Sequence, residues 1–550
     1  MDLFIVAVLV LCSLTVPTFG DKGSSKARTC SDIQQFYGAK GFKQNVVPQF
    51  EISGEHLRIC PQGYTCCTSE MEGELATLTR RETEGLLREF KRPLQSSLLH
   101  SYRTFDGYMV DLMNRSMIIL EDTFISTWGI LYARNSMLFQ ELYQDLRDYY
   151  QSGNVNLEEV LTEFWTKLLE KVFYQANKLS SVGEDYQECV SKKIETLRLF
   201  GEAPHKMTTQ VTRTFVAARA FLQGLHISRE VVGKVLQVPL NPKCFKAIMR
   251  MTYCPHCRGM PTAKPCANYC TNVMKGCFAN QADLHTEWSH LADTMIEVGE
   301  HRLDDMDSVI LSLPNQISEA LFTMEDNMAS INSKLFQACG SLSKGGATGS
   351  GFDDITTRKS AVTDSLGDSN NKLANSVTDI NIKLREMRPY WISLPKLLCS
   401  DRVASGTGAE DKCWNGMSRA RYLPEVIGDG LANQINNPEV EIDITKPDMK
   451  IRQQIMQLKI MTNKLKNALN GRDVDFQDNS DDVSGSGSGL CADELCSRGP
   501  RLIVPVTERP IVYAYPPRNK EVRSSVSQSL PSISILLLPL VILLLQRYLI

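Results

Sequence analysis

The chain has 550 residues, with 60 lysines and arginines against 63 aspartates and glutamates, and its formal net charge is −3 at pH 7. A chain so close to neutrality lacks both the basic surface of a nucleic-acid-binding protein and a polybasic patch for anionic lipids. Its length suffices for a large core and for two or three ordinary domains. Nucleic acid is therefore excluded as the expected partner.

The N-terminus has the pattern of a secretory signal peptide. An apolar run over 3–16 precedes Thr18 and Gly20, which occupy the positions expected before a cleavage site. Cleavage after Gly20 would remove Cys12 and leave 16 of the 17 cysteines. An even number fits a disulfide framework formed in an oxidising compartment. We predict a signal peptide over 1–20.

The body, 21–471, is predicted to be mainly α-helical. Apolar residues recur at steps of three and four over 157–173, and Asn156 with Glu159 forms a capping-box pattern at the start of this segment. Gly471 is predicted to end the last helix. No run of alternating strands appears, so the sequence predicts an all-α fold. The same helical spacing recurs over 68–92, 100–150, 206–239, 281–337 and 451–469.

Two segments lack this periodicity. Residues 341–375 are rich in Gly, Ser and Asp and are predicted to form a flexible loop. Residues 472–525 alternate acid, Ser-Gly, Pro and basic residues and are predicted to form a disordered stalk. A flexible chain of that length spans on the order of 40 Å, which would hold the body clear of a membrane.

The C-terminus has the pattern of a signal for a GPI anchor. The apolar run over 530–545 is shorter than the ~20 residues that span a bilayer, and small residues with a short polar spacer precede it. We predict attachment at Ser525, or at Ser524, because Ser527 then supplies the small residue two positions after Ser525. Residues 526–550 would be removed. The alternative is a short transmembrane helix.

The densest cysteine group lies between residues 254 and 277. Cys254, Cys257, His256 and Cys266 have zinc-knuckle spacing, but disulfides are the default in a secreted chain. The vicinal pair at 66–67 would strain a bond between its own members, so each cysteine is expected to reach a distant partner.

The spacing Cys-x2-Cys-x-Gly-Met-x4-Pro-Cys-x2-Tyr-Cys-x2-Val-x2-Gly-Cys over 254–277 resembles the glypican family signature at every specified position. Segments 52–71 and 421–449 also resemble glypican segments, and the likeness weakens only over 341–375 and after Cys496. The resemblance implies an elongated multi-helix core stapled by disulfides, with a cysteine-rich N-terminal lobe. The implied pairs are Cys30–Cys66, Cys60–Cys254, Cys67–Cys257, Cys189–Cys339, Cys244–Cys277, Cys266–Cys413 and Cys270–Cys399.

Three consecutive Ser-Gly pairs place Ser484, Ser486 and Ser488 between acidic residues. Glycine after each serine keeps the backbone out of a helix and leaves the hydroxyl accessible to a glycosyltransferase, and the acid suits a basic acceptor groove. The resemblance implies heparan sulfate on these serines. A plain Gly/Ser linker is the alternative, and Ser350 is a weaker candidate. Asn114, in the sequon Asn-Arg-Ser, is a predicted N-glycosylation site.

Cys491 and Cys496 follow the serines. A local disulfide is the favoured interpretation, and thiols that respond to redox state or metal are the alternative. The resemblance implies no required cofactor, with copper or zinc binding open.

The pattern of His285, Glu287 and His290 is not that of a metalloprotease helix, because histidines five apart cannot share one metal. With no nucleophile elbow, P-loop or dinucleotide fingerprint, we predict no catalytic residue and no enzyme.

The resemblance implies a GPI-anchored heparan sulfate proteoglycan with a monomeric core on the outer leaflet of the plasma membrane, with a shed form and endosomal recycling. Its chains would concentrate heparin-binding growth factors and morphogens of the FGF, Wnt, BMP and Hedgehog type and present them as a co-receptor. The alternative is an adhesion or ligand-binding module that acts through its core, with the N-terminal lobe binding lipid-modified or other ligands.

Overall fold

The computed structural model describes residues 28–39, 46–176, 185–186, 188–189, 192–193, 200–340, 370–405 and 412–473. All of these belong to one compact unit of the chain. The strands in these ranges are β1 (Ile52–Ser53) and β2 (Tyr64–Thr65), which form one antiparallel pair. The predicted all-α fold is confirmed.

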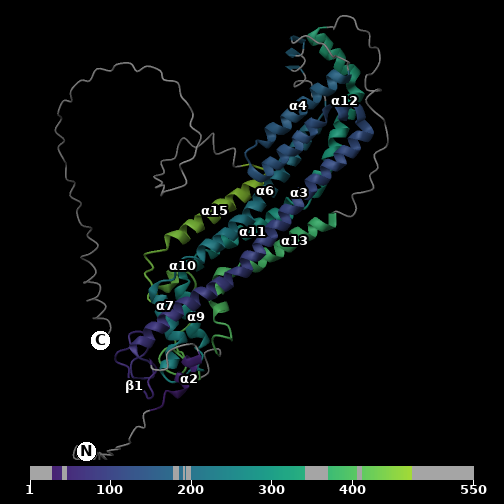
Figure 1. Cartoon of the computed structure of the whole chain (residues 1–550). Coiled ribbons are helices and arrows are strands. Elements are labelled where there is room, and N and C mark those ends of the chain that lie inside the picture. Colours follow the sequence, from purple (N-terminus) through teal and green to yellow (C-terminus); the bar gives the residue numbers. More distant parts are fainter. Residues whose placement is uncertain are drawn as a thin grey trace, which may run out of the picture. The chain divides into compact units, whose positions relative to one another are not determined.

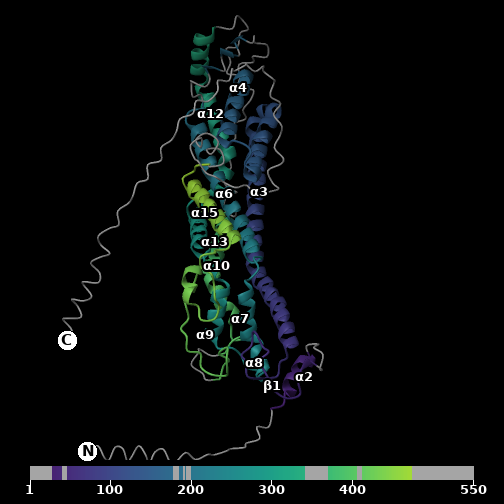
Figure 2. The same ribbon diagram turned by 90° about the vertical axis from the view of Figure 1, so that its left-hand side faces the viewer.

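The long helices of this unit lie side by side (Figures 1 and 2). Helix α3 packs against α4, α6 and α12, while α15 packs on α6 and α11. Three tryptophans, Trp128, Trp288 and Trp391, are completely buried between the helices. The bounds are α3 (Ser69–Ser152), α4 (Leu157–Ala176), α6 (Ala203–Val235), α11 (His285–His301), α12 (Met306–Cys339), α13 (Asn370–Met387) and α15 (Met449–Leu469).

Short elements gather at one end of the bundle (Figure 2). We call this the cysteine-rich end, and it comprises α2 (Ser31–Ala39), β1, β2, α7 (Pro242–Thr252), α8 (Cys254–Cys257) and α9 (Ala267–Cys277). Three other short helices connect it to the long ones. They are α10 (Ala279–Ala282), α14 (Tyr390–Leu398) and the 3-10 helix η2 (Leu431–Asn436).

Helix α3 is longer than the sequence predicts. The segments predicted separately over 68–92 and 100–150 form one continuous element that runs through Pro93 and is kinked at Trp128, where a φ of −118° and a ψ of 28° are not helical. It begins where the Thr68 hydroxyl accepts a hydrogen bond from the Met71 backbone N–H, and it ends at Gly153, whose φ is 67°. Burial of one face against α6 and α12 outweighs the hydrogen bond that proline removes.

Two other predicted boundaries are wrong. The predicted helix over 281–337 is broken at 302–305, where α11 ends and α12 begins, because the turn buries Leu303 completely. Residues 370–375, predicted to be the end of the flexible loop, belong to α13. The rest of that loop lies outside the described residues.

The predicted end at residue 239 is also wrong, because α6 ends at Val235. The end residues predicted at Asn156 and Gly471 are confirmed. Asn156 Oδ1 accepts hydrogen bonds from the backbone N–H groups of Glu158 and Glu159 at the start of α4. Gly471, with a φ of 70°, follows α15 as predicted. Among the described helices, none is both long enough and apolar enough to cross a membrane.

Candidate functional site

The described residues contain seven disulfides. Six of them lie within the cysteine-rich end or link it to Cys399 and Cys413, and the seventh, Cys189–Cys339, is at the end of α12. All seven are pairs that the resemblance implies, and their Cα–Cα distances run from 4.9 to 5.8 Å. Vicinal Cys66 and Cys67 bond to different partners, Cys30 and Cys257. The zinc-knuckle interpretation is wrong, because Cys254, Cys257 and Cys266 are all oxidised.

The hairpin β1–β2 is held against α8 by hydrogen bonds as well as by disulfides. The Cys257 carbonyl accepts from the Cys66 backbone N–H at 2.8 Å and from the Thr65 hydroxyl at 3.0 Å. His256 is buried in the same turn, with Nδ1 2.9 Å from the Tyr37 hydroxyl of α2. Residues far apart in sequence are therefore fixed relative to one another at this end.

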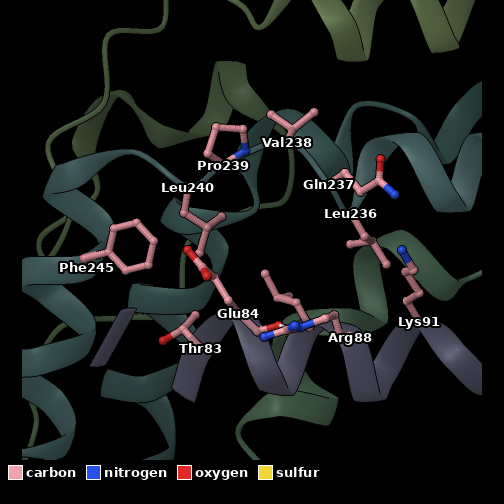
Figure 3. Close-up of a pocket in the computed structure, with 11 residues that line it drawn as sticks. Thr83, Glu84, Arg88, Lys91, Leu236, Gln237, Val238, Pro239, Leu240 and Phe245 are labelled. Carbon is pink, nitrogen blue, oxygen red and sulfur yellow. Dashed lines mark hydrogen bonds between the residues drawn. The ribbon is translucent and has the colours of Figure 1, made fainter. Parts of the chain in front are cut away.

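A cavity of about 300 Å³ lies between α3 and the segment that joins α6 to α7. One wall, from Leu236 to Leu240, is apolar except for Gln237, and Phe245 of α7 lies at its side (Figure 3). Arg88 and Lys91 of α3 line the opposite wall, together with Glu84 and Thr83. Such a combination suits a ligand with an apolar body and a polar end.

A second apolar cavity of about 70 Å³ shares Thr83 and Leu87 with the first. It is lined by residues of α3, α7, α9 and α14, including Ile248, Met251 and Phe278. The two cavities therefore meet the same turn of α3, and sequence periodicity could not have shown either of them.

The model of the glypican family matches residues 10–547, which is nearly the whole chain. Glypican-1 of Gallus gallus is 50% identical over 535 residues, covering 96% of each chain, and glypican-1 of Homo sapiens is 48% identical over 540 residues, covering 98% of this chain and 95% of that one. The chain belongs to the glypican family.

Solved structures agree with this assignment. Crystalline C-terminally truncated glypican-1 matches with a TM-score of 0.73 at 48% identity, covering 82% of this chain and all of that one. Dally-like protein in complex with O-palmitoleoyl serine matches with a TM-score of 0.64 at 31% identity, covering 81% of this chain and all of that one. Glypicans are cell-surface proteoglycans and not enzymes, which agrees with the absence of predicted catalytic residues in the sequence.

The predicted glycan and anchor sites of this glypican follow the described residues. Ser484, Ser486, Ser488, Ser524 and Ser525 all lie outside them, as do the alternative site Ser350 and the pair Cys491 and Cys496. Their modification and redox state remain predictions. Within the described ranges, no group of three or more His, Cys, Asp or Glu side chains is placed to hold a metal ion.

The segment that follows α15 is held against α3 at Asp473. The Tyr149 hydroxyl at the end of α3 donates a hydrogen bond to Asp473 Oδ2, and the buried Arg219 guanidinium lies 5.5 Å from the Tyr149 ring. Burial, together with this hydrogen bond, raises the pKa of the Tyr149 hydroxyl, so it remains protonated as a donor. The segment that leads to the predicted glycan sites therefore starts from an anchored residue.

The predicted N-glycosylation site lies on α3. Asn114 is exposed, and its Oδ1 accepts a hydrogen bond from Arg147 Nη2 at 2.9 Å. Ser116 of the same sequon is buried, bonded to the Tyr143 hydroxyl and the Ile310 carbonyl at 2.6 Å each. Because an oligosaccharyltransferase must reach both residues, modification would have to precede packing of α3.

The histidines that the sequence analysis excluded as metal ligands lie on α11. His285 Nδ1 is 3.3 Å from the Ser289 hydroxyl, and His290 Nδ1 is 3.8 Å from Glu287 Oε2. Their contacts are with helix neighbours, as expected for residues that cap or face solvent.

Proposed function

We propose that the chain is a GPI-anchored heparan sulfate proteoglycan whose sulfated chains concentrate basic growth factors and morphogens and present them to receptors. The observation that carries the proposal is the acid-flanked triplet Ser484, Ser486 and Ser488, each followed by glycine, in a member of a cell-surface proteoglycan family. The first serine follows the anchored Asp473 by eleven residues, a span of at most about 40 Å.

The net charge of the chain supports the proposal that the sulfated chains, rather than the polypeptide, attract basic ligands. A net charge of −3 gives the polypeptide little attraction for basic ligands. Sulfated chains would supply that attraction through many weak ion pairs, so capture is strong at low salt and falls as salt screens the charges. FGF, Wnt, BMP and Hedgehog proteins are the types of ligand we propose.

A triple variant, Ser484→Ala with Ser486→Ala and Ser488→Ala, tests the glycan sites. We expect the wild-type protein to run as a smear that heparan sulfate lyase sharpens, and the triple variant to run sharp without lyase. Capture of a basic growth factor should be lost in the variant while its thermal unfolding stays within about 0.5 kcal/mol of wild type. Ser480→Ala, which changes a serine followed by aspartate, is the matched control. A sharp wild-type band would contradict the proposal.

Phosphatidylinositol-specific phospholipase C tests the anchor. We expect the enzyme to release the protein from cells, with Ser525 as the new C-terminal residue. Recovery of peptides from 533–545 in the mature protein, together with retention on cells after digestion, would show a different attachment.

We propose a second candidate function, direct binding of an acylated ligand by the core. It is supported by the cavity lined by Leu236, Val238 and Leu240, and by the complex of Dally-like protein with O-palmitoleoyl serine. Val238→Phe, which fills the cavity, should weaken binding of O-palmitoleoyl serine to the chain-free triple variant by about tenfold or more. Ile460→Phe, at an exposed site on α15, should not. Equal binding by both variants would place the ligand elsewhere.

A further inference from the structure

A second concave surface lies at the cysteine-rich end, separate from the cavities beside α3. It is an open groove of about 700 Å³ formed by residues from five separate stretches of the sequence. Three arginines line it, Arg28, Arg258 and Arg419, with Glu51 as the carboxylate among its lining residues.

Arg258 is held in place by the β1–β2 turn. It follows α8 directly, and its Nη2 donates to the Gln62 carbonyl at 2.8 Å while its Nη1 lies 3.4 Å from the Tyr64 carbonyl. Gly63 permits this approach, because a Cβ there would lie 2.9 Å from Arg258 Nη1. Arg258 Nε is buried with no hydrogen-bond partner among the described residues. The guanidinium is therefore preorganised and still has donors to offer.

The other two arginines come from segments that disulfides fix. Arg28 lies two residues before Cys30, and its carbonyl accepts from the Glu51 backbone N–H at 3.0 Å. Arg419 lies on the loop that follows Cys413, and its Nε donates to the Lys412 carbonyl at 2.9 Å. Cys30 is bonded to Cys66, whose neighbour Cys67 is bonded to Cys257 of α8, and Cys413 is bonded to Cys266, directly before α9.

The groove carries an excess of positive charge. Three guanidinium groups face one carboxylate, and within the described ranges no ion pair neutralises any of the three. Its rim is amphipathic, because Tyr64 is 70% exposed and Met417 is 62% exposed. Exposed apolar side chains beside arginines suit a ligand that has both anionic groups and apolar faces.

We propose that this groove binds a segment of a sulfated glycosaminoglycan, with its sulfo and carboxylate groups on Arg28, Arg258 and Arg419 and a sugar ring against Tyr64. Guanidinium groups form paired hydrogen bonds with planar or tetrahedral oxyanions, which lysines do not. Pyranose rings have apolar C–H faces that pack on an aromatic ring. The inference rests on the proposed function for its source of ligand, because chains on Ser484–Ser488 would be present at high local concentration.

The test uses the chain-free triple variant, so that no attached glycan competes, and a heparin hexasaccharide as the probe. We expect Arg28→Gln with Arg419→Gln to raise the Kd about tenfold and to flatten its dependence on salt, because two charge-assisted contacts are lost. Arg421→Gln, the same change on the same loop but outside the groove, should alter Kd less than about twofold. Tyr64→Ala should weaken binding without changing the salt dependence. Arg258 is left intact because it bonds the hairpin.

The outcomes separate this inference from the proposed function. If lyase shows chains on the wild-type protein but the chain-free core does not bind the hexasaccharide at low salt, the inference fails and the proteoglycan assignment stands. If lyase shows no chains on the wild-type protein but its core still binds the hexasaccharide through the arginines, the groove is supported and the proteoglycan assignment is overturned. A polyglutamate peptide that binds as tightly as the hexasaccharide would overturn the choice of ligand. Unchanged melting of each variant establishes that the fold is intact.

Discussion

Asp307 is a buried carboxylate in the first turn of α12, where it accepts a hydrogen bond from the Tyr108 hydroxyl. Burial raises the pKa of this carboxyl above its ordinary value, although the hydrogen bond from Tyr108 and the charge of Arg115 oppose the shift. A raised folded-state pKa contributes stability that is present below the unfolded pKa and is lost as pH rises through the folded value.

We therefore predict that Asp307→Asn, which cannot ionise, becomes more stable relative to wild type as pH rises from about 4 to about 7. Chemical denaturation at several pH values measures the difference. Other carboxyl groups titrate in both proteins and cancel. A difference that does not vary with pH would show that Asp307 is not desolvated.

Gly153 closes α3 with a φ of 67°, and a Cβ at this position would lie 1.8 Å from Arg219 Nη2. We predict that Gly153→Ala destabilises the protein by about 1–3 kcal/mol, because it strains the backbone and displaces the buried Arg219 from the Tyr149 ring. Gly107→Ala, within the same helix and with open space around the Cβ, should instead stabilise by about 0.5–1 kcal/mol. Denaturant titrations check both predictions, which require the free energy of unfolding to change with opposite sign in the two variants.

At the scale of elements, α3 shows that packing against other helices can maintain a helix through a proline, a residue that disfavours helix locally. Pro93 removes one backbone hydrogen bond from the helix interior and crowds the preceding turn. We predict that Pro93→Ala, at this exposed position, stabilises the protein by about 1–3 kcal/mol. The neighbouring Gly85→Ala controls for helix propensity alone. A loss of stability in Pro93→Ala would mean that the packing of α3 requires the proline itself.

The helices were predictable, but some of their limits were not. Apolar periodicity identified α4, α6 and α15, and Asn156 and Gly471 correctly marked ends, because caps are local chemistry. Continuity through Pro93 and the break before Met306 depend on burial against other helices, which a single sequence does not encode locally.

Some of the functional residues could likewise be predicted from the sequence, and others could not. The Ser-Gly triplet is visible because its chemistry is contiguous in sequence. The disulfide pairs required the family resemblance, since spacing alone permits many connectivities. Arg28, Arg258 and Arg419 gave no signal, because only folding brings their segments to one groove.

At the scale of the whole molecule, the disulfides contribute to the stability of the described unit. Cys67–Cys257 closes a loop of 190 residues and fixes the hairpin to α8. We predict that Cys257→Ala leaves a free thiol on Cys67, costs about 2–5 kcal/mol and retains the chain in the secretory pathway. Secreted yield and thiol labelling measure this.

The double variants separate the effect of the lost bridge from that of the free thiol. Cys67→Ala with Cys257→Ala should still lower stability and yield. Cys244→Ala with Cys277→Ala should cost less, because the bridge that it removes closes a loop of only 33 residues between α7 and α9. Normal secretion of Cys257→Ala without a reactive thiol at Cys67 would contradict the assigned pairing.

The positions of the bridges also determine how the protein responds to a mechanical load. Cys413 is the last cysteine in a described bridge, and α15 lies beyond it, held to α6 and α11 by packing and by ion pairs such as Lys459–Glu287, without a covalent link. A force applied at Asp473 would first break the contact with Tyr149 and then peel α15 away, until it reached the covalent stop at Cys266–Cys413. The released segment, 414–473, has a contour length of about 200 Å. Under such a load, this glypican would lengthen by a set amount, and the segments joined by the bridges up to Cys413 would remain covalently linked.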